Sequence, residues 1–190
     1  MSLIGKQAPD FTATAVTKSK MHEMSLNELK GEYLVLFFYP LDFTFVCPTE
    51  LHAFEEKRAE FEKRGARLIG CSVDSPFSHF AWLRTPKSQG GIEGVSYPIL
   101  SDLDKEIAKS YDVLNEAGVA YRGLFLIDKE GIVRHQLIND LPLGRSVDEA
   151  IRVLDALIFH EKNGEVCPAN WKEGEKSLKP TQEGLVEFFN

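Results

Sequence analysis

The chain has little cysteine, no long apolar run and no excess of positive charge. Only three of its 190 residues are cysteines and no two of them form a Cys-x-x-Cys pair, unlike the dense, even count of a disulfide-stapled secreted domain. With 22 basic and 29 acidic side chains, the net charge of −7 argues against a nucleic-acid partner. Isolated cysteines in such a chain are either inert core residues or reactive ones.

No apolar run reaches the roughly 18–20 residues that a membrane helix needs. The longest candidate, Tyr33 to Tyr39, has the length of a strand, and the first residues show no charged segment followed by an apolar stretch. We therefore expect no membrane partner and a cytoplasmic location. The histidines lack metal-ligand spacing and no glycine-rich phosphate loop follows a strand, so we expect no metal and no other cofactor.

Hydrophobic periodicity alternates between strand and helix along the chain. Apolar or alternating runs predict strands at 11–16, 33–39, 67–73, 124–127 and 133–138. Helical spacing predicts helices from Pro48 to about Arg64 and at 77–83, 102–110 and 147–158. A hairpin turn joins the last two strands. This order predicts an α/β fold with a mixed central sheet flanked by helices.

The sequence changes character at Glu161, where it becomes charged and is broken by glycine and proline. This change predicts a compact domain at 1–160 and a C-terminal extension at 161–190. Cys71 lies in a predicted buried strand and is interpreted as a core residue. Cys167 lies in the broken tail, where a redox role fits better than a core role.

Cys47 directly precedes Pro48, and proline suits the first position of a helix. The exposed N–H groups and the dipole of a helix start favour an anion, here the thiolate. A free thiol is only a few per cent thiolate at pH 7, and making it mostly thiolate needs roughly 3.4 kcal/mol. A helix terminus contributes at most about 2 kcal/mol, so a nearby cation is needed, for which an arginine is expected. A buried cysteine that merely precedes a helix is the alternative.

The loop before this cysteine carries residues suited to a reactive site. Thr44 lies three residues upstream, where its hydroxyl could reach the thiolate or a bound oxygen. Pro40 closes the loop from the other side. We expect Phe43, Phe45 and Val46 to form an apolar pocket that shields the thiol.

The segment YPLDFTFVCPTE (39–50) closely resembles the active-site loop of the peroxiredoxins, and GEVCPANWKEGEKSLKP (164–180) resembles the resolving-cysteine region of their typical two-cysteine subgroup. SVDSPFSHFAW (72–82), RGLFLID (122–128) and GRSVDEAIRVLDAL (144–157) resemble that subgroup too. The resemblance spans essentially the whole chain. It implies a thioredoxin-like fold with a C-terminal extension and the activity of an alkyl hydroperoxide reductase C-type enzyme, or thioredoxin peroxidase.

The resemblance also implies the roles of individual residues. Cys47 would be the peroxidatic nucleophile, whose thiolate attacks a hydroperoxide and becomes a sulfenic acid. Thr44 would hold the thiolate and the peroxide oxygens, and Pro40 would shield the site. Arg122 would supply the required cation, although the sequence alone would not select it among the arginines.

Two further residues match the family's active site, and each has a simpler interpretation. Glu50 would orient the arginine at 122, but an acid in the first turn of a helix is favoured by the dipole alone. Arg145 would be a second arginine near the site, or else a surface residue before a helix.

Cys167 would be the resolving cysteine, which attacks the sulfenic acid of Cys47 and forms a disulfide. In the typical subgroup this disulfide joins two subunits of a homodimer, and the dimers close into rings of five. Phe77 and His79 match the contact between dimers, and a surface helix with one buried aromatic is the less favoured alternative. Without a cofactor, electrons would come from thioredoxin or from a flavoprotein-linked disulfide reductase.

Two other functions compete with this interpretation. A thiol–disulfide oxidoreductase would carry Cys-x-x-Cys at the helix start, which Pro48, Thr49 and Glu50 contradict. A chaperone-like holdase activity of large assemblies is the alternative, as a second function that would not need the thiol.

The chain departs from over-oxidation-sensitive peroxiredoxins at two places. It has Gly90-Gly91-Ile92-Glu93 where they have Gly-Gly-Leu-Gly, and Phe188 stands where they have tyrosine. Our hypothesis is that Phe188 and Phe189 still slow disulfide formation, which would give intermediate sensitivity.

Overall fold

The computed structural model describes residues 2–190. The chain divides into two compact units, Met1–Val147 and Asp148–Asn190, and each is described by itself. Compactness alone does not define a domain, so the boundary predicted after residue 160 stays a prediction.

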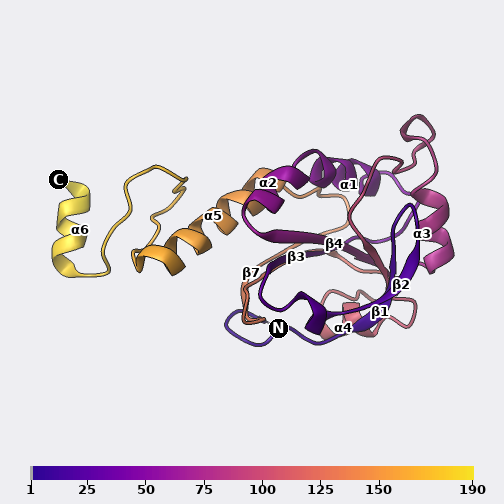
Figure 1. Cartoon of the computed structure of the whole chain (residues 1–190), viewed down its shortest axis with the longest axis horizontal. Coiled ribbons are helices and arrows are strands. Elements are labelled where there is room, and N and C mark those ends of the chain that lie inside the picture. The colour runs from indigo at the N-terminus through magenta and orange to yellow at the C-terminus, as the bar shows by residue number, and fades with distance from the viewer. Residues whose placement is uncertain (1) are drawn as a thin grey trace. The chain divides into compact units, whose positions relative to one another are not determined.

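The first unit is built on a seven-stranded sheet in the order β2-β1-β5-β4-β3-β6-β7 (Figure 1). The strands are β1 (Thr12–Val16), β2 (Met21–Ser25), β3 (Tyr33–Phe38), β4 (Ala66–Ser72), β5 (Ile99–Ser101), β6 (Arg122–Ile127) and β7 (Val133–Asn139). β4 pairs in parallel with β3 and β5, and the other pairings are antiparallel. The sheet is therefore mixed, which confirms the predicted fold class.

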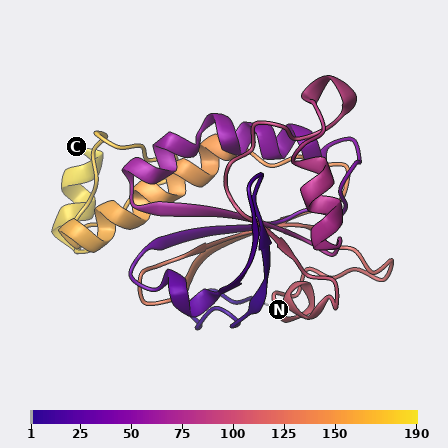
Figure 2. The same ribbon diagram turned by 45° about the vertical axis from the view of Figure 1, so that its right-hand side comes forward.

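Helices cover both faces of this sheet. They are η1 (Leu26–Leu29), α1 (Cys47–Glu56), α2 (Arg58–Lys63), α3 (Pro76–Trp82), η2 (Lys87–Gln89) and α4 (Glu106–Ser110). Both views place α1 and α2 on one side of the sheet and η1 and α4 on the other (Figures 1 and 2).

Strand β3 is buried on both faces because its residues all lie under one helical layer or the other. Toward α1, Phe37 stacks on Phe54 with ring centroids 4.2 Å apart. Toward α4, Phe38 packs on Tyr111 with centroids 5.4 Å apart. The end of β3, where the loop to Cys47 begins, is therefore held rigidly on both sides.

The structure differs from the sequence prediction at several element boundaries. The helix predicted from Pro48 to Arg64 is two helices, because the backbone at Lys57 leaves the helical region (φ −101°, ψ 3°). The helix predicted at 102–110 begins only at Glu106, because Lys105 adopts a left-handed φ of 67°. Strands β2 and β5 were not predicted.

The second unit holds α5 (Val147–Asn163), apart from its first residue, and α6 (Gln182–Phe189), of which α6 was not predicted. A bridge between Val166 and Leu178 folds the intervening segment back on itself. Trp171 is buried inside this turn, with its ring centroid 4.8 Å from that of Phe159. The tail therefore has local structure of its own around Cys167.

Residues 2–190 show neither a membrane-crossing helix nor a cluster of metal-binding side chains. None of the described helices has the length and apolar character that crossing a membrane requires. Within the same residues, no three His, Cys, Asp or Glu side chains gather in a way that could hold a metal ion.

Candidate active site

Cys47 is the first residue of α1, and its side chain is fully buried. The helix starts when the carbonyl of Val46 accepts hydrogen bonds from the amides of Thr49 (3.0 Å) and Glu50 (3.2 Å). Pro48 occupies the first turn, where its missing N–H costs no hydrogen bond. The sulfur thus lies at the positive end of a helix, as predicted from the Cys-Pro step.

Two donors from separate parts of the chain contact the sulfur. The Thr44 hydroxyl lies 3.0 Å from Cys47 Sγ, and Arg122 Nη1 lies 3.4 Å from it. The same hydroxyl lies 2.8 Å from the Leu41 carbonyl. Because a hydroxyl has a single proton, it can serve only one of these acceptors, and an ionised sulfur would form the stronger, charge-assisted bond.

A buried carboxylate ties both arginines to the helix that carries the cysteine. Arg122 Nη1 donates to Glu50 Oε2 over 2.7 Å, and Arg145 Nε donates to Glu50 Oε1 over 2.8 Å. All three side chains are at most 4% exposed. Two guanidinium groups against one carboxylate leave one positive charge in excess beside the sulfur, and a thiolate would balance it.

The second arginine joins separate elements and does not reach the sulfur itself. Arg145 Nη1 donates to the carbonyls of Phe38 (2.7 Å), at the end of β3, and Gly123 (2.5 Å), in β6. Its backbone N–H donates to Glu50 Oε1 over 2.8 Å. The side chain therefore fixes α1 against the sheet and is no surface residue.

The ionisation of Glu50 follows from these partners. Burial by itself would raise its pKa, but Arg145 and then Arg122 outweigh burial and hold the pKa below its usual value. At neutral pH the group is therefore a carboxylate, as the two ion pairs require.

The prediction that Phe43 and Phe45 help to form an apolar pocket around the thiol is wrong. Phe43 and Phe45 are 53% and 92% exposed, while Pro40 at the end of β3 is buried. Phe43 adopts a left-handed φ of 53°, which turns this part of the loop outward, and its ring packs at 5.7 Å from that of Trp82. The side chains that contact the buried sulfur are polar, namely Thr44 and Arg122.

Comparison with known proteins places this geometry in a family. The AhpC/TSA family model matches residues 4–136, and the model of the C-terminal domain of 1-Cys peroxiredoxin matches residues 156–190. The chain belongs to the AhpC/TSA family. It is 56% identical over 187 residues to Peroxiredoxin-4 of Dictyostelium discoideum, covering 98% of this chain and 72% of that one.

Other members of the AhpC/TSA family are similar to this chain over nearly the full length of both proteins. The chain is 50% identical to mouse Peroxiredoxin-2, with 98% of this chain and 95% of the relative covered. The reduced 2-Cys peroxiredoxin of Plasmodium vivax is 46% identical, covers 100% of this chain and 99% of its own, and superposes with a TM-score of 0.97. The chain is accordingly a thiol peroxidase, an oxidoreductase with a thioredoxin-like fold.

The other two cysteines of this family member have different surroundings. Cys71 is fully buried in β4, where burial raises its thiol pKa strongly, which confirms it as a core residue. Cys167 is half-buried in the second unit, where burial raises its pKa and the nearby Arg152 partly opposes that effect. All three cysteines are free thiols.

A buried network that sequence reasoning missed anchors the start of the active-site loop. The carboxylate of Asp42 accepts hydrogen bonds from the Tyr39 hydroxyl (2.8 Å) and the Ser78 hydroxyl (2.8 Å), and lies 2.9 Å from His79 Nδ1. The only signal in the sequence was an acid amid the aromatic residues of the loop. His79, matched by resemblance to a dimer contact, is fully buried inside the chain, whereas Phe77 is 75% exposed.

Proposed function

We propose that the Cys47 thiolate is the peroxidatic nucleophile of this peroxidase. It attacks the O–O bond of hydrogen peroxide or an organic hydroperoxide, so that sulfur loses two electrons and becomes a sulfenic acid. The leaving oxygen takes a proton and departs as water or an alcohol. The observation that carries the proposal is the pair of donors, Thr44 and Arg122, within hydrogen-bonding reach of a buried sulfur at a helix start.

The neighbouring groups would stabilise charge as it moves from sulfur to oxygen. Thr44 and Arg122 already donate toward the sulfur and would donate to the peroxide oxygens as charge develops there. Glu50 and Arg145 would act as positioning residues that hold Arg122 in place. Pro40 would keep water from the sulfur.

We infer that Cys167 of a second subunit completes the cycle. Its thiolate would attack the sulfenic acid, release water and form an intersubunit disulfide. Thioredoxin or a flavoprotein-linked disulfide reductase would then reduce this disulfide, and the homodimers would assemble into a ring of five. Free thiols suit a reducing compartment such as the cytoplasm.

The nucleophile can be tested by trapping the intermediate. The Cys167→Ser variant is given one equivalent of hydrogen peroxide together with dimedone, and the labelled peptide is identified by mass spectrometry. We expect the label on Cys47 alone, and Cys71→Ala should leave labelling unchanged. A label on Cys71, or none after peroxide is consumed, would refute the assignment.

A holdase activity of large assemblies is a second proposed function. Phe45 and Phe77, the most exposed aromatic side chains of the loop and of α3, are candidates for binding apolar segments of client proteins. This activity would survive Cys47→Ser, whereas peroxidase turnover would be lost. Measuring the aggregation of a heated client protein with this variant separates the two functions.

A further inference from the structure

Cys47 is fully buried at the start of α1, so a cysteine of another subunit reaches its sulfur only when this end of the helix opens. In an α-helix each amide bonds to the carbonyl four residues earlier. Unwinding the first turn through Pro48 therefore also releases the backbone of His52. Any contact that holds the second turn of α1 in place makes the opening around Cys47 rarer.

His52 connects the second turn of α1 to the loop that follows η2. Its Nε2 atom lies 3.1 Å from the Gly91 carbonyl oxygen. A carbonyl oxygen can only accept, so the N–H of the ring is the donor. The histidine side chain is half-buried, which partly shields this hydrogen bond from water. The bond therefore joins the helix that carries Cys47 to a segment 39 positions along the chain from His52.

The loop around Gly91 is tightly packed and leaves this carbonyl little freedom to move. The indole N–H of the fully buried Trp82 donates to the Gly90 carbonyl over 2.9 Å. A Cβ atom at Gly91 would lie 1.9 Å from the carbonyl oxygen of Thr85, so the two backbones are in close contact. If α1 opens, the Gly91 carbonyl cannot follow the ring of His52, and their hydrogen bond breaks.

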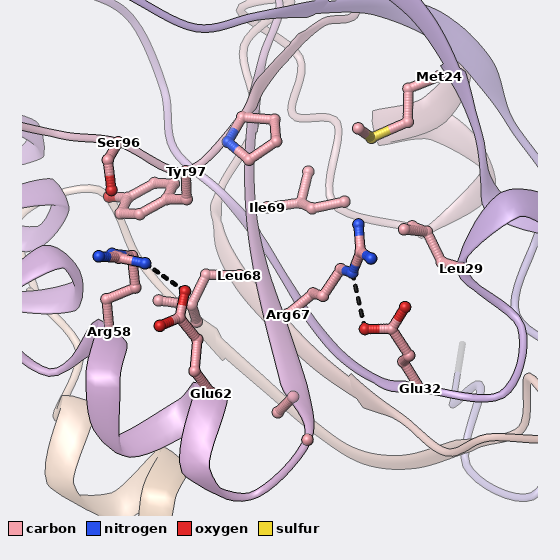
Figure 3. A pocket seen from close by; sticks show the side chains of 13 residues that line it. Met24, Leu29, Glu32, Arg58, Glu62, Arg67, Leu68, Ile69, Ser96 and Tyr97 are labelled. Carbon is pink, nitrogen blue, oxygen red and sulfur yellow. Dashed lines mark hydrogen bonds and ion pairs between the residues drawn. The ribbon is translucent and has the colours of Figure 1, made fainter.

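Two further contacts hold the same part of α1. The Tyr97 hydroxyl donates to the Leu51 carbonyl over 2.8 Å. The Glu55 carboxylate accepts from the Ser96 amide over 2.9 Å and pairs with Arg58 at 3.1 Å. Figure 3 shows Ser96 and Tyr97 next to Arg58, on one side of a cavity. The second turn is therefore held both by its backbone and by its side chains.

We propose that His52 is a positioning residue whose hydrogen bond to Gly91 holds α1 closed and delays the exposure of Cys47 to Cys167. The inference rests on the role proposed above for Cys167. One partly shielded hydrogen bond that is lost on opening lowers the open population about fivefold. The sulfenic acid of Cys47 therefore waits longer for its partner, which lengthens the time available for over-oxidation.

Alkylation of the Cys167→Ser variant with a bulky maleimide measures this opening without peroxide and without Cys167. Cys47 reacts only when α1 opens, and Cys71, fully buried in β4, reacts only when the sheet itself unfolds. Mass spectrometry of the labelled peptides separates the two rates. We expect His52→Leu in this background to speed the labelling of Cys47 about fivefold and to leave the labelling of Cys71 unchanged. His52→Gln, whose side-chain amide can still donate to Gly91, should label like wild type.

Helix propensity predicts the opposite effect of the same change. Leucine forms helices more readily than histidine, so a role of position 52 in helix formation alone predicts slower labelling of Cys47 in His52→Leu. The matched control is His160→Leu, which removes a similar contact of 2.8 Å between a histidine ring and the Glu165 carbonyl at the end of α5. This control should leave the labelling of Cys47 unchanged.

Disulfide formation after one equivalent of hydrogen peroxide completes the test in the chain with all three cysteines. His52→Leu should form the disulfide between Cys47 and Cys167 about fivefold faster than wild type. Unchanged or slower labelling of Cys47 in His52→Leu, or an equal increase at Cys71, would overturn the proposal. So would faster labelling with no change in the rate of disulfide formation. If wild type forms no disulfide, the role proposed for Cys167 fails, and the labelling rates alone decide whether His52 holds α1 closed.

Discussion

At the scale of single residues, the active site is organised around one uncompensated positive charge. Glu50 neutralises one of the two arginines, and the helix start and Thr44 add further donors toward the sulfur. The sequence predicts a cation near the thiol in addition to the helix terminus, and Arg122 Nη1 lies 3.4 Å from the sulfur. Because the buried site is stabilised by the pairing of opposite charges, removing the carboxylate should disturb the site as much as removing one of the arginines.

Glu50→Gln tests this balance. The variant leaves two buried guanidinium groups without a counter-charge, so we expect the free energy of unfolding to fall by about 3–5 kcal/mol and kcat/KM for peroxide to fall with it. Chemical denaturation and a peroxide-consumption assay measure the two effects. The exposed Glu116→Gln serves as control and should change neither. If the Glu50→Gln variant is as stable as wild type, the ion pairs of Glu50 with the two arginines contribute nothing to the free energy of unfolding.

Asp102 gives the chain a pH-dependent stability away from the active site. It is 1% exposed and accepts from the amides of Ile107 (2.9 Å) and Ala108 (2.7 Å), and burial raises its pKa to about 6. The folded state thus binds a proton more tightly than the unfolded state, whose carboxyl titrates near its ordinary value. Stability from this group is gained as pH falls through 6 and lost as pH rises.

Asp102→Asn removes this titration. Between pH 7 and pH 5, the free energy of unfolding of wild type should rise by about 1 kcal/mol relative to the variant. Urea denaturation of both proteins at the two pH values measures the difference, in which all other titrating groups cancel. If the free energy of unfolding of wild type relative to the variant is unchanged or lower at pH 5 than at pH 7, Asp102 does not have a raised pKa in the folded state.

Local residue patterns revealed part of the site, and tertiary structure supplied the rest. Thr44 and Pro40 lie in one loop with Cys47, so spacing alone could suggest them. Arg122 begins β6 and reaches the sulfur only because β6 pairs with β3, a long-range contact that periodicity does not encode. Here the family resemblance supplied what the residue pattern lacked.

At the scale of elements, the major strands and helices followed from periodicity because each buries a continuous apolar face. The elements that periodicity failed to predict are short or irregular. β5 has three residues, too few to show a period, and β2 carries only a partly buried pattern. The break at Lys57 lies inside an unbroken helical pattern, so nothing local marked it.

Helix α3 offers a test of how an element supports the active-site loop. Ser75 caps it by accepting from the Ser78 amide over 3.2 Å, and the helix carries His79 to Asp42. We expect Ser75→Ala to lower the free energy of unfolding by about 1 kcal/mol. The exposed Ser88→Ala, which removes no cap, should stay within about 0.5 kcal/mol of wild type in thermal denaturation. Equal effects of the two changes would contradict the capping role.

At the scale of the whole molecule, the C-terminal unit carries both the proposed resolving cysteine and the aromatic tail. Phe188 packs on Phe189 with ring centroids 5.3 Å apart. Lys176 Nζ lies 5.4 Å from the centroid of the Phe188 ring and donates to the carbonyls of Glu187 and Phe188. These contacts order α6 within its own unit. That the tail affects the rate of disulfide formation stays a prediction.

Titration of activity loss against peroxide tests that hypothesis. Deleting residues 182–190 should make the enzyme more resistant to over-oxidation, because the sulfenic acid would be resolved sooner. Phe188→Tyr should make it more sensitive, and Phe159→Tyr is the matched control outside the tail helix. Unchanged sensitivity after deletion would remove the tail from the mechanism.

We expect Cys47 and Cys167 to act together in the turnover of peroxide. The most direct measurement is hydrogen peroxide consumption with a thioredoxin system by wild type, Cys47→Ser and Cys167→Ser, with a non-reducing gel of each. We expect loss of turnover in both variants and a disulfide-linked dimer formed by wild type alone. Full activity of Cys47→Ser would contradict it outright, and loss in that variant alone would leave the nucleophile but remove Cys167 as its obligatory partner.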